Sequence, residues 1–144
     1  MNLVAVKQAL INVLAAAVTA AEENQVQVAY SWPGKRAERE CVHGGLVEWE
    51  QSSGGIAAGD DTASVTMLIH VVISHPGATV AETDARATAI GAVLEAGLIA
   101  DDTLGGQAGV MSARVAGGDL DHGEDDDGAS SVLTLRIALR CYQP

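Results

Sequence analysis

The sequence is short of large aromatic rings and of positive charge. Its 144 residues include no phenylalanine, two tryptophans and two tyrosines, and eight lysines and arginines stand against 19 acidic residues. The resulting net charge of −11 argues against binding to DNA phosphates or anionic membranes by electrostatic attraction. A negative wall nevertheless suits a conduit, because DNA slides past it without being held at phosphate contacts.

Cysteines are few and the motifs of catalysis are missing. Cys41 and Cys141 are isolated in the sequence, and we expect buried reduced thiols, with a disulfide as the alternative. The four histidines form no HxH or HExxH pattern, and neither a GxSxG elbow nor a phosphate-binding glycine loop occurs. We therefore expect no catalytic residue, no metal and no cofactor. An enzyme that uses His70 or His75 is the remaining catalytic alternative.

Apolar residues make up 48% of the chain and are mostly aliphatic. A chain of this length buries roughly 68% of its unfolded surface, so residues 1–144 are expected to form one domain with an aliphatic core. The first twenty residues are apolar but include Lys7, Gln8 and Asn12, without a basic start. We therefore expect neither a signal peptide nor a membrane span.

The first half of the chain reads as a helix followed by two strands. Apolar residues recur every three or four positions over residues 2–21, which predicts a helix. Alternation then predicts a strand through residues 26–30, and Pro33-Gly34 predicts a turn. A second strand is expected over residues 38–51, with a bulge at Gly44-Gly45, followed by a loop at residues 52–61.

The second half contains the clearest alternation. Residues 63–75 are apolar on both faces, which predicts a central strand covered on both sides. A helix is expected over residues 79–99, with Glu82 and Arg86 spaced for an intrahelical ion pair. Strands follow at residues 110–116 and 130–142, and the acidic, glycine-rich stretch 117–128 between them is expected to be an exposed hairpin tip.

This order of elements predicts an α+β fold. Short, hairpin-type links favour a mainly antiparallel sheet, and the helices are expected to pack together on one face of it. On the last strand the leucines alternate with Arg136 and Arg140, so these arginines are expected on the bare face. A bare sheet face of this kind is a common surface for assembly.

Two further surfaces are candidates for binding. A Trp-Pro-Gly corner carries a compact ring-and-charge cluster, which comprises Trp32, Lys35, Arg36 and Arg39. The predicted acidic hairpin carries the opposite charge to this cluster. Its acidic residues are Asp119, Asp121, Glu124, Asp125, Asp126 and Asp127. A calcium-binding module is one alternative interpretation of these acids, but Ser130 occupies the twelfth position, where a calcium loop needs a carboxylate.

The chain as a whole resembles the tail terminator proteins of long-tailed bacteriophages. The resemblance is carried by the N-terminal helix from Asn2, the strand into Tyr30-Ser31-Trp32-Pro33-Gly34-Lys35, the Arg39-Glu40-Cys41-Val42 strand, and the 81–98 helix before a long final hairpin. It covers nearly the whole chain. Tail-tube proteins and other neck proteins look similar, so the resemblance extends to that wider group of ring proteins.

The resemblance implies a structural virion protein that is made in the host cytoplasm and forms a hexameric ring at the neck end of the tail. Such a ring caps the tail tube, ends its polymerisation and joins it to the head-completion, or connector, protein. DNA passes through the centre without specific binding. The expected contacts with a neighbouring subunit or with the tube are the ring-and-charge cluster around Trp32 and, separately, Arg136 and Arg140. The acidic stretch is expected in the lumen or at the rim.

Overall fold

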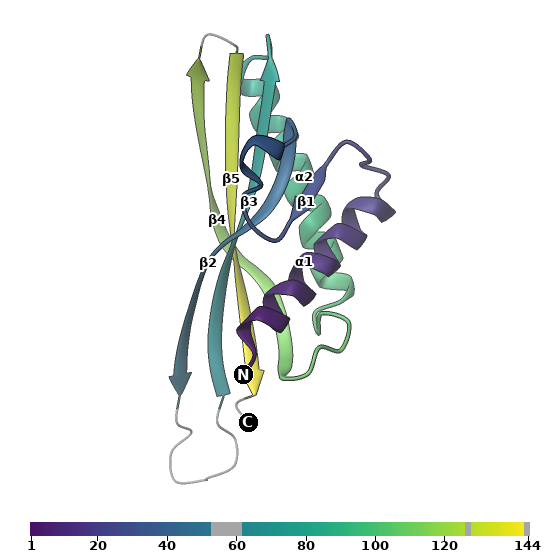
Figure 1. Ribbon diagram of the computed structural model, residues 1–144, viewed down its shortest axis with the longest axis vertical. Coiled ribbons are helices and arrows are strands. Elements are labelled where there is room, and N and C mark those ends of the chain that lie inside the picture. Colours follow the sequence, from purple (N-terminus) through teal and green to yellow (C-terminus); the bar gives the residue numbers. More distant parts are fainter. Residues whose placement is uncertain (53–61, 126–127, 143–144) are drawn as a thin grey trace.

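The computed structural model describes residues 1–52, 62–125 and 128–142. Two helices lie on one side of a long, twisted sheet, and the N-terminus lies near the C-terminal end of β5 (Figure 1). The elements are α1 (Leu3–Ala20), β1 (Gln27–Ala29), the short 3₁₀ helix η1 (Gly34–Arg36), β2 (Glu40–Ser52), β3 (Thr62–Pro76), α2 (Val80–Ala100), β4 (Val110–Asp125) and β5 (Gly128–Tyr142). Most of the loop expected at 52–61 lies outside the described residues.

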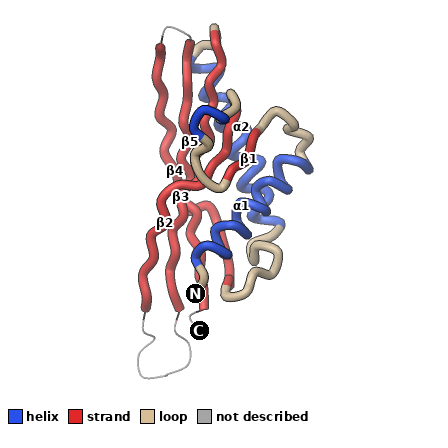
Figure 2. The backbone as a smooth tube through the Cα atoms, viewed as in Figure 1, coloured by secondary structure: helices blue, strands red, loops and turns tan. Residues whose placement is uncertain are grey.

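The predicted α+β fold is confirmed. The five strands form one sheet in the order β1-β2-β3-β5-β4, and every neighbouring pair except one is antiparallel. The exception lies at the Trp-Pro-Gly corner, where a turn between two strands was expected: β1 runs parallel to β2. The chain therefore crosses over between these two strands, and the corner is part of that crossover (Figure 2).

Both helices start at side-chain caps that satisfy free backbone N–H groups. The Asn2 side chain accepts from the N–H of Ala5 at 3.0 Å, and Thr79 accepts from the N–H of Glu82 at 3.2 Å. The helices also pack closely on each other, since a Cβ built on Gly97 would collide with the Cβ of Ala17. By length and composition α1 could cross a membrane, but in this fold one of its faces is buried in the core.

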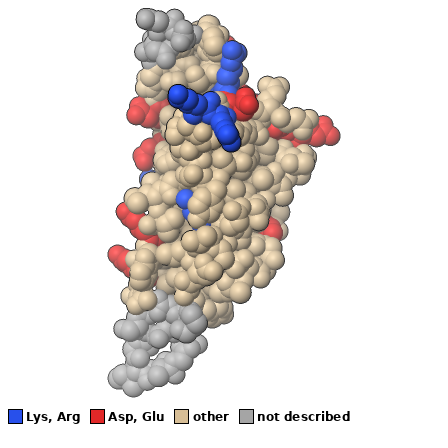
Figure 3. Space-filling view, in the orientation of Figure 1, with Lys and Arg blue, Asp and Glu red and all other residues tan. Residues whose placement is uncertain are grey.

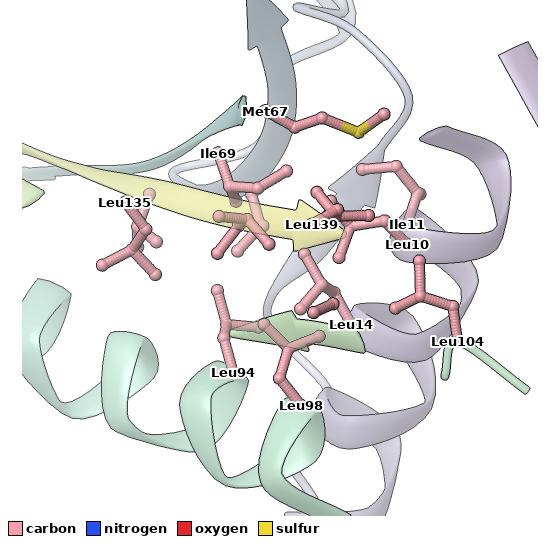
Figure 4. Packing of buried hydrophobic residues seen from close by; sticks show 14 of the residues in the cluster. Leu10, Ile11, Leu14, Met67, Ile69, Leu94, Leu98, Leu104, Leu135 and Leu139 are labelled. Carbon is pink, nitrogen blue, oxygen red and sulfur yellow. The ribbon is translucent and has the colours of Figure 1, made fainter. Parts of the chain in front are cut away.

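The core fills the space between the helices and one face of the sheet, here called the inner face. Leucines from α1 and α2 meet the buried residues of β3 and β5 there (Figure 4). Its largest fully buried side chains are almost all aliphatic: Leu10, Leu14, Met67, Ile69, Ile73, Ile90, Leu94, Leu98, Ile137, Leu139, Val6 and Val42. The buried residues of the strands among these therefore determine which face of the sheet lies against the helices.

Among the described residues, no α-helix packs on the opposite, outer face. β3 is central, as predicted, but coverage on both faces is not observed: its inner side chains are buried, whereas Leu68 and Val72 on the outer face are only partly buried. Arg136 and Arg140 are exposed on this outer face, which confirms their predicted side. The predicted bulge in β2 is also present, as a register shift between Gly44 and Val47.

The acidic stretch is not the hairpin loop that the sequence predicted. β4 continues through it to Asp125, so residues 117–125 pair with β5 as an edge strand. Pairing with β5 overrides the low strand preference of glycine and aspartate, because a long partner strand is available beside it. Of the acidic residues, Asp126 and Asp127 lie outside the described residues.

Candidate interaction surfaces

The Trp-Pro-Gly corner is a short segment held by side-chain contacts from β1 and β2. Gly34 takes a φ of 64°, which glycine adopts without strain, and opens the η1 turn. The Gln27 side chain holds the segment from below: its Nε2 donates to the Arg36 carbonyl at 3.3 Å, and its Oε1 accepts from the Glu38 N–H at 2.8 Å. The position of the corner is therefore set by β1.

Trp32 attaches the corner to the outer face. Its ring meets the His43 ring edge-on at 5.2 Å between centroids, and His43 lies 5.0 Å from His70. His70 Nδ1 is 2.9 Å from the Thr134 hydroxyl, so a row of polar side chains crosses the three strands β2, β3 and β5. Burial, with a contribution from His43, lowers the pKa of His70, which favours its neutral form.

The basic side chains of the corner are free. Lys35, Arg36 and Arg39 are all exposed, and within the described part of the chain none of them makes an ion pair. Figure 3 shows Lys and Arg atoms gathered over this segment, while acidic atoms line the edge of the view along the sheet. The predicted cluster is thus assembled as one surface, here called the basic corner, that can receive an acidic partner.

The two tryptophans do not share a surface, although they are close in the sequence. Trp32 covers the outer face beside His43. Trp49 pairs in register with Val65, a core residue, and so belongs to the inner face, where its side chain is 49% exposed. The register shift in β2 and the crossover before it separate the two rings.

The outer face carries both acidic and basic side chains on the strand pair β4 and β5. Arg136 reaches Asp119 across the two strands at 3.5 Å, and a Cβ at Gly117 would collide with its guanidinium group. Asp121 and Arg140 are exposed on the same face, and neither forms an ion pair among the described residues. The side chains of Glu124 and Asp125 lie outside the described part.

An extended strand also bears on the calcium alternative. Successive side chains of β4 point to opposite faces, so Asp119 and Asp121 share one face with an intervening residue on the other. A calcium loop instead curls its ligands around one point. Among the described residues, no three His, Cys, Asp or Glu side chains come together as a metal site would require.

A partly buried ion network lies where α2 crosses the end of the sheet, and the sequence did not predict it. Arg86 binds Glu40 through Nε at 2.8 Å and Nη2 at 2.9 Å, and binds Glu23 through Nη2 at 2.6 Å. The Nε2 atom of His75 adds a contact to Glu40 at 2.9 Å. The expected pair between Glu82 and Arg86 is therefore wrong, since Glu82 instead accepts from the Thr79 hydroxyl.

The network favours the charged forms of Glu40 and Arg86. Glu40 is only 4% exposed, yet its hydrogen bonds to Arg86, with help from His75, hold the pKa of its carboxyl below the usual range. The carboxylates in turn raise the pKa of Arg86. A neighbouring set of hydrogen bonds links Thr83, Ser131 and Asp84. Glu40 and His75 also line an open cavity of about 550 Å³, together with residues such as Gln27. Because Glu40 is held by Arg86 and His75, and the network ties α2 to the sheet, we assign these groups to stability.

The two cysteines are buried free thiols, as expected. By register Cys41 lies on the outer face and Cys141 on the inner face, so the two cannot bond to each other. Burial raises the pKa of both thiols, which lowers their reactivity.

The fold defines a class of α+β protein with a two-helix layer over a long, mostly antiparallel sheet. No protein-family model matches the chain, and no curated protein matches it. Among solved structures, the fold is similar to that of a chain in the virion of a native gene transfer agent particle, with a TM-score of 0.60. The alignment covers 90% of this chain and 84% of that one at 17% sequence identity.

Proposed function

We propose that this chain is a structural protein of a virion and forms a ring in its tail. The observation that carries the proposal is the fold shared, over 90% of this chain, with a chain of a gene transfer agent virion. The bare outer face and the unpaired basic corner support it, because each is a surface available for assembly. The proposed role requires no catalysis.

Within the virion we propose the role of tail terminator. A hexameric ring of this chain would sit at the neck end of the tail, cap the tube and end its polymerisation. Its other side would join the head-completion protein, and DNA would pass through the centre. The net charge of −11 favours this passage, because a negative protein offers phosphates little attraction.

The basic corner is proposed as the contact with the last tube ring. Its three free cations sit on a segment fixed by Gln27 and Trp32, so binding orders little flexible chain. An acidic surface on the tube protein would complement it, which favours rapid and oriented docking.

The proposal is tested by tube length. Tails assembled in cells from which this protein has been removed should carry tubes of excess and variable length in negative-stain images, because polymerisation is no longer stopped. The wild-type chain supplied from a plasmid should restore a uniform length.

Two results would contradict the terminator role. Tubes of normal, uniform length without the protein would show that another component ends polymerisation. The complete absence of tubes would instead identify this chain as a tube or other ring subunit. A virion purified without this chain would overturn the structural role altogether.

A further inference from the structure

Both edges of the sheet are partly open. β1 pairs only with residues Cys41–His43 of β2, so within the described residues the rest of β2, from Leu46 to Ser52, has no strand beside it on that edge. β4 is the opposite edge and pairs only with β5. Open edges present unpaired N–H and C=O groups, which are templates for another strand.

The open part of β2 and the first residues of β4 lie at the same height along the strand direction, on opposite edges of the sheet. Register pairs carry a straight row across the sheet from Glu48 through Thr66 and Ala138 to Arg114. The open half of β2 is thus at the same end of the sheet as residues 110–115 of β4. Each step across the sheet reverses the strand direction, so β2 and β4 run opposite ways.

We propose that residues 46–52 of one copy pair, antiparallel, with residues 110–115 of the next copy. The contact joins two different edges, so it is heterologous and its repetition closes a ring when the rotation between copies allows it. The inference rests on the proposed ring and names the surfaces that build it. Each join extends the sheet of one subunit into the next.

Charge on the outer face selects a second copy as the occupant. Glu48 and Glu50 are exposed on the open edge of β2, and Arg114 is exposed on the edge of β4, all on the outer face. Within the described chain none of the three forms an ion pair. Pairing the edges places the glutamates beside Arg114 of the next copy, where opposite charges across strands stabilise a sheet.

Shape on the inner face agrees with the same register. The row of Trp49 runs through Val65 and Leu139 to Ala113. Ala113 lines a groove of about 460 Å³ between the end of α2 and the edge of β4, whose apolar lining includes Leu98, Ile99, Ala113 and Val115. The half-exposed Trp49 ring of one copy therefore enters the groove of the next. If the two edges pair with a register shifted by two residues, each side chain still lies on the same face of the sheet, because side chains alternate between faces.

A charge exchange tests the contact. Glu48→Arg places like charges at every join, and so does Arg114→Glu. Each variant alone should weaken self-association at least tenfold, measured by light scattering over a concentration series. In an equimolar mixture, copies of the two variants that alternate carry opposite charges at every join, so the mixture should recover the mass of the wild-type assembly. Trp49→Ala should also weaken association.

Asp121→Arg is the matched control for Glu48→Arg. It makes the same change from negative to positive charge, at a position of β4 that lies outside residues 110–115. It should leave the assembly intact. Circular dichroism melts confirm that each variant is folded, and a disulfide between Glu48→Cys and Arg114→Cys in different copies reports the contact directly.

Folded single variants that assemble as wild type, or a mixture that fails to restore association while both chains are folded, would overturn the edge contact. Neither result touches the terminator role, which is judged by tube length. Conversely, tubes of uniform length without the protein would overturn that role and leave the restored assembly of the mixture standing.

Discussion

At the scale of single residues, Arg86 has the clearest energetic role. It neutralises Glu40, which is 4% exposed, and it also binds Glu23 at the end of α1. A buried charge that loses its partner is strongly destabilising, whereas exposed pairs contribute little. Arg86 therefore holds α1, α2 and β2 in one arrangement.

Arg86→Ala should lower the free energy of unfolding by roughly 3 kcal/mol at neutral pH, because Glu40 is left charged and buried. In the wild-type protein the lowered pKa of Glu40 gives stability that is present above about pH 4.3 and is lost as acid titrates the carboxyl. Without Arg86, burial dominates and protonation of Glu40 becomes favourable. The difference between the two proteins should therefore shrink on acidification.

Urea unfolding followed by tryptophan fluorescence across this pH range measures the difference. Arg140→Ala is the control, since Arg140 is exposed and unpaired among the described residues, and should change stability by less than about 0.5 kcal/mol. A difference for Arg86→Ala that is small or independent of pH would contradict the role of the network.

At the scale of elements, the basic corner is the feature that the sequence and the structure describe alike. The Pro-Gly turn signal predicted a bend, and Gly34 supplies it with a positive φ. The surroundings were not predictable, because Gln27 and His43, which hold the segment, belong to strands paired through the crossover. The turn itself is thus encoded by neighbouring residues, whereas its position in the fold depends on contacts with β1 and β2.

Arg36→Glu combined with Arg39→Glu should weaken binding to tube rings at least tenfold, or by about 1.4 kcal/mol, because it reverses the charge of the docking surface. Both side chains are exposed and unpaired within the described chain, so the fold should be unaffected. Co-sedimentation with tubes measures binding. Gln8→Glu with Asn12→Glu adds negative charge on α1 and should bind normally; equal loss in both variants would show a general effect of charge.

At the scale of the whole molecule, the protein is asymmetric. One face of the sheet is closed by two helices over an aliphatic core (Figure 1). The other face bears exposed charged residues such as Asp121, Arg136 and Arg140. Within the described residues, parts of β2 and β4 have no strand beside them on the two edges of the sheet. The proposed ring would pair these edges with each other.

The assembled particle should have about six times the 14.7 kDa mass of the chain. Light scattering at increasing concentration, with and without tube protein, measures this mass, and negative-stain images should show rings with a central opening. Particles of monomer mass alone, at high concentration and with tube protein present, would contradict ring formation.

The sequence by itself determined the kind and order of the elements. Both helices, the central place of β3, the β2 bulge and the exposed side of Arg136 follow from periodicity and turn residues, because these are local properties of the chain. The basic corner was predicted for the same reason, since its cations are neighbours in the sequence.

Only the tertiary structure decided which distant residues meet. Arg86 joined Glu23 and Glu40 because the crossing of α2 over the sheet brings them within reach, and the acidic stretch became a strand because β5 lies beside it. The row from Glu48 to Arg114 crosses four strands and has no trace in sequence spacing. Contacts of this kind depend on strand order and register, which the chain settles only when it folds.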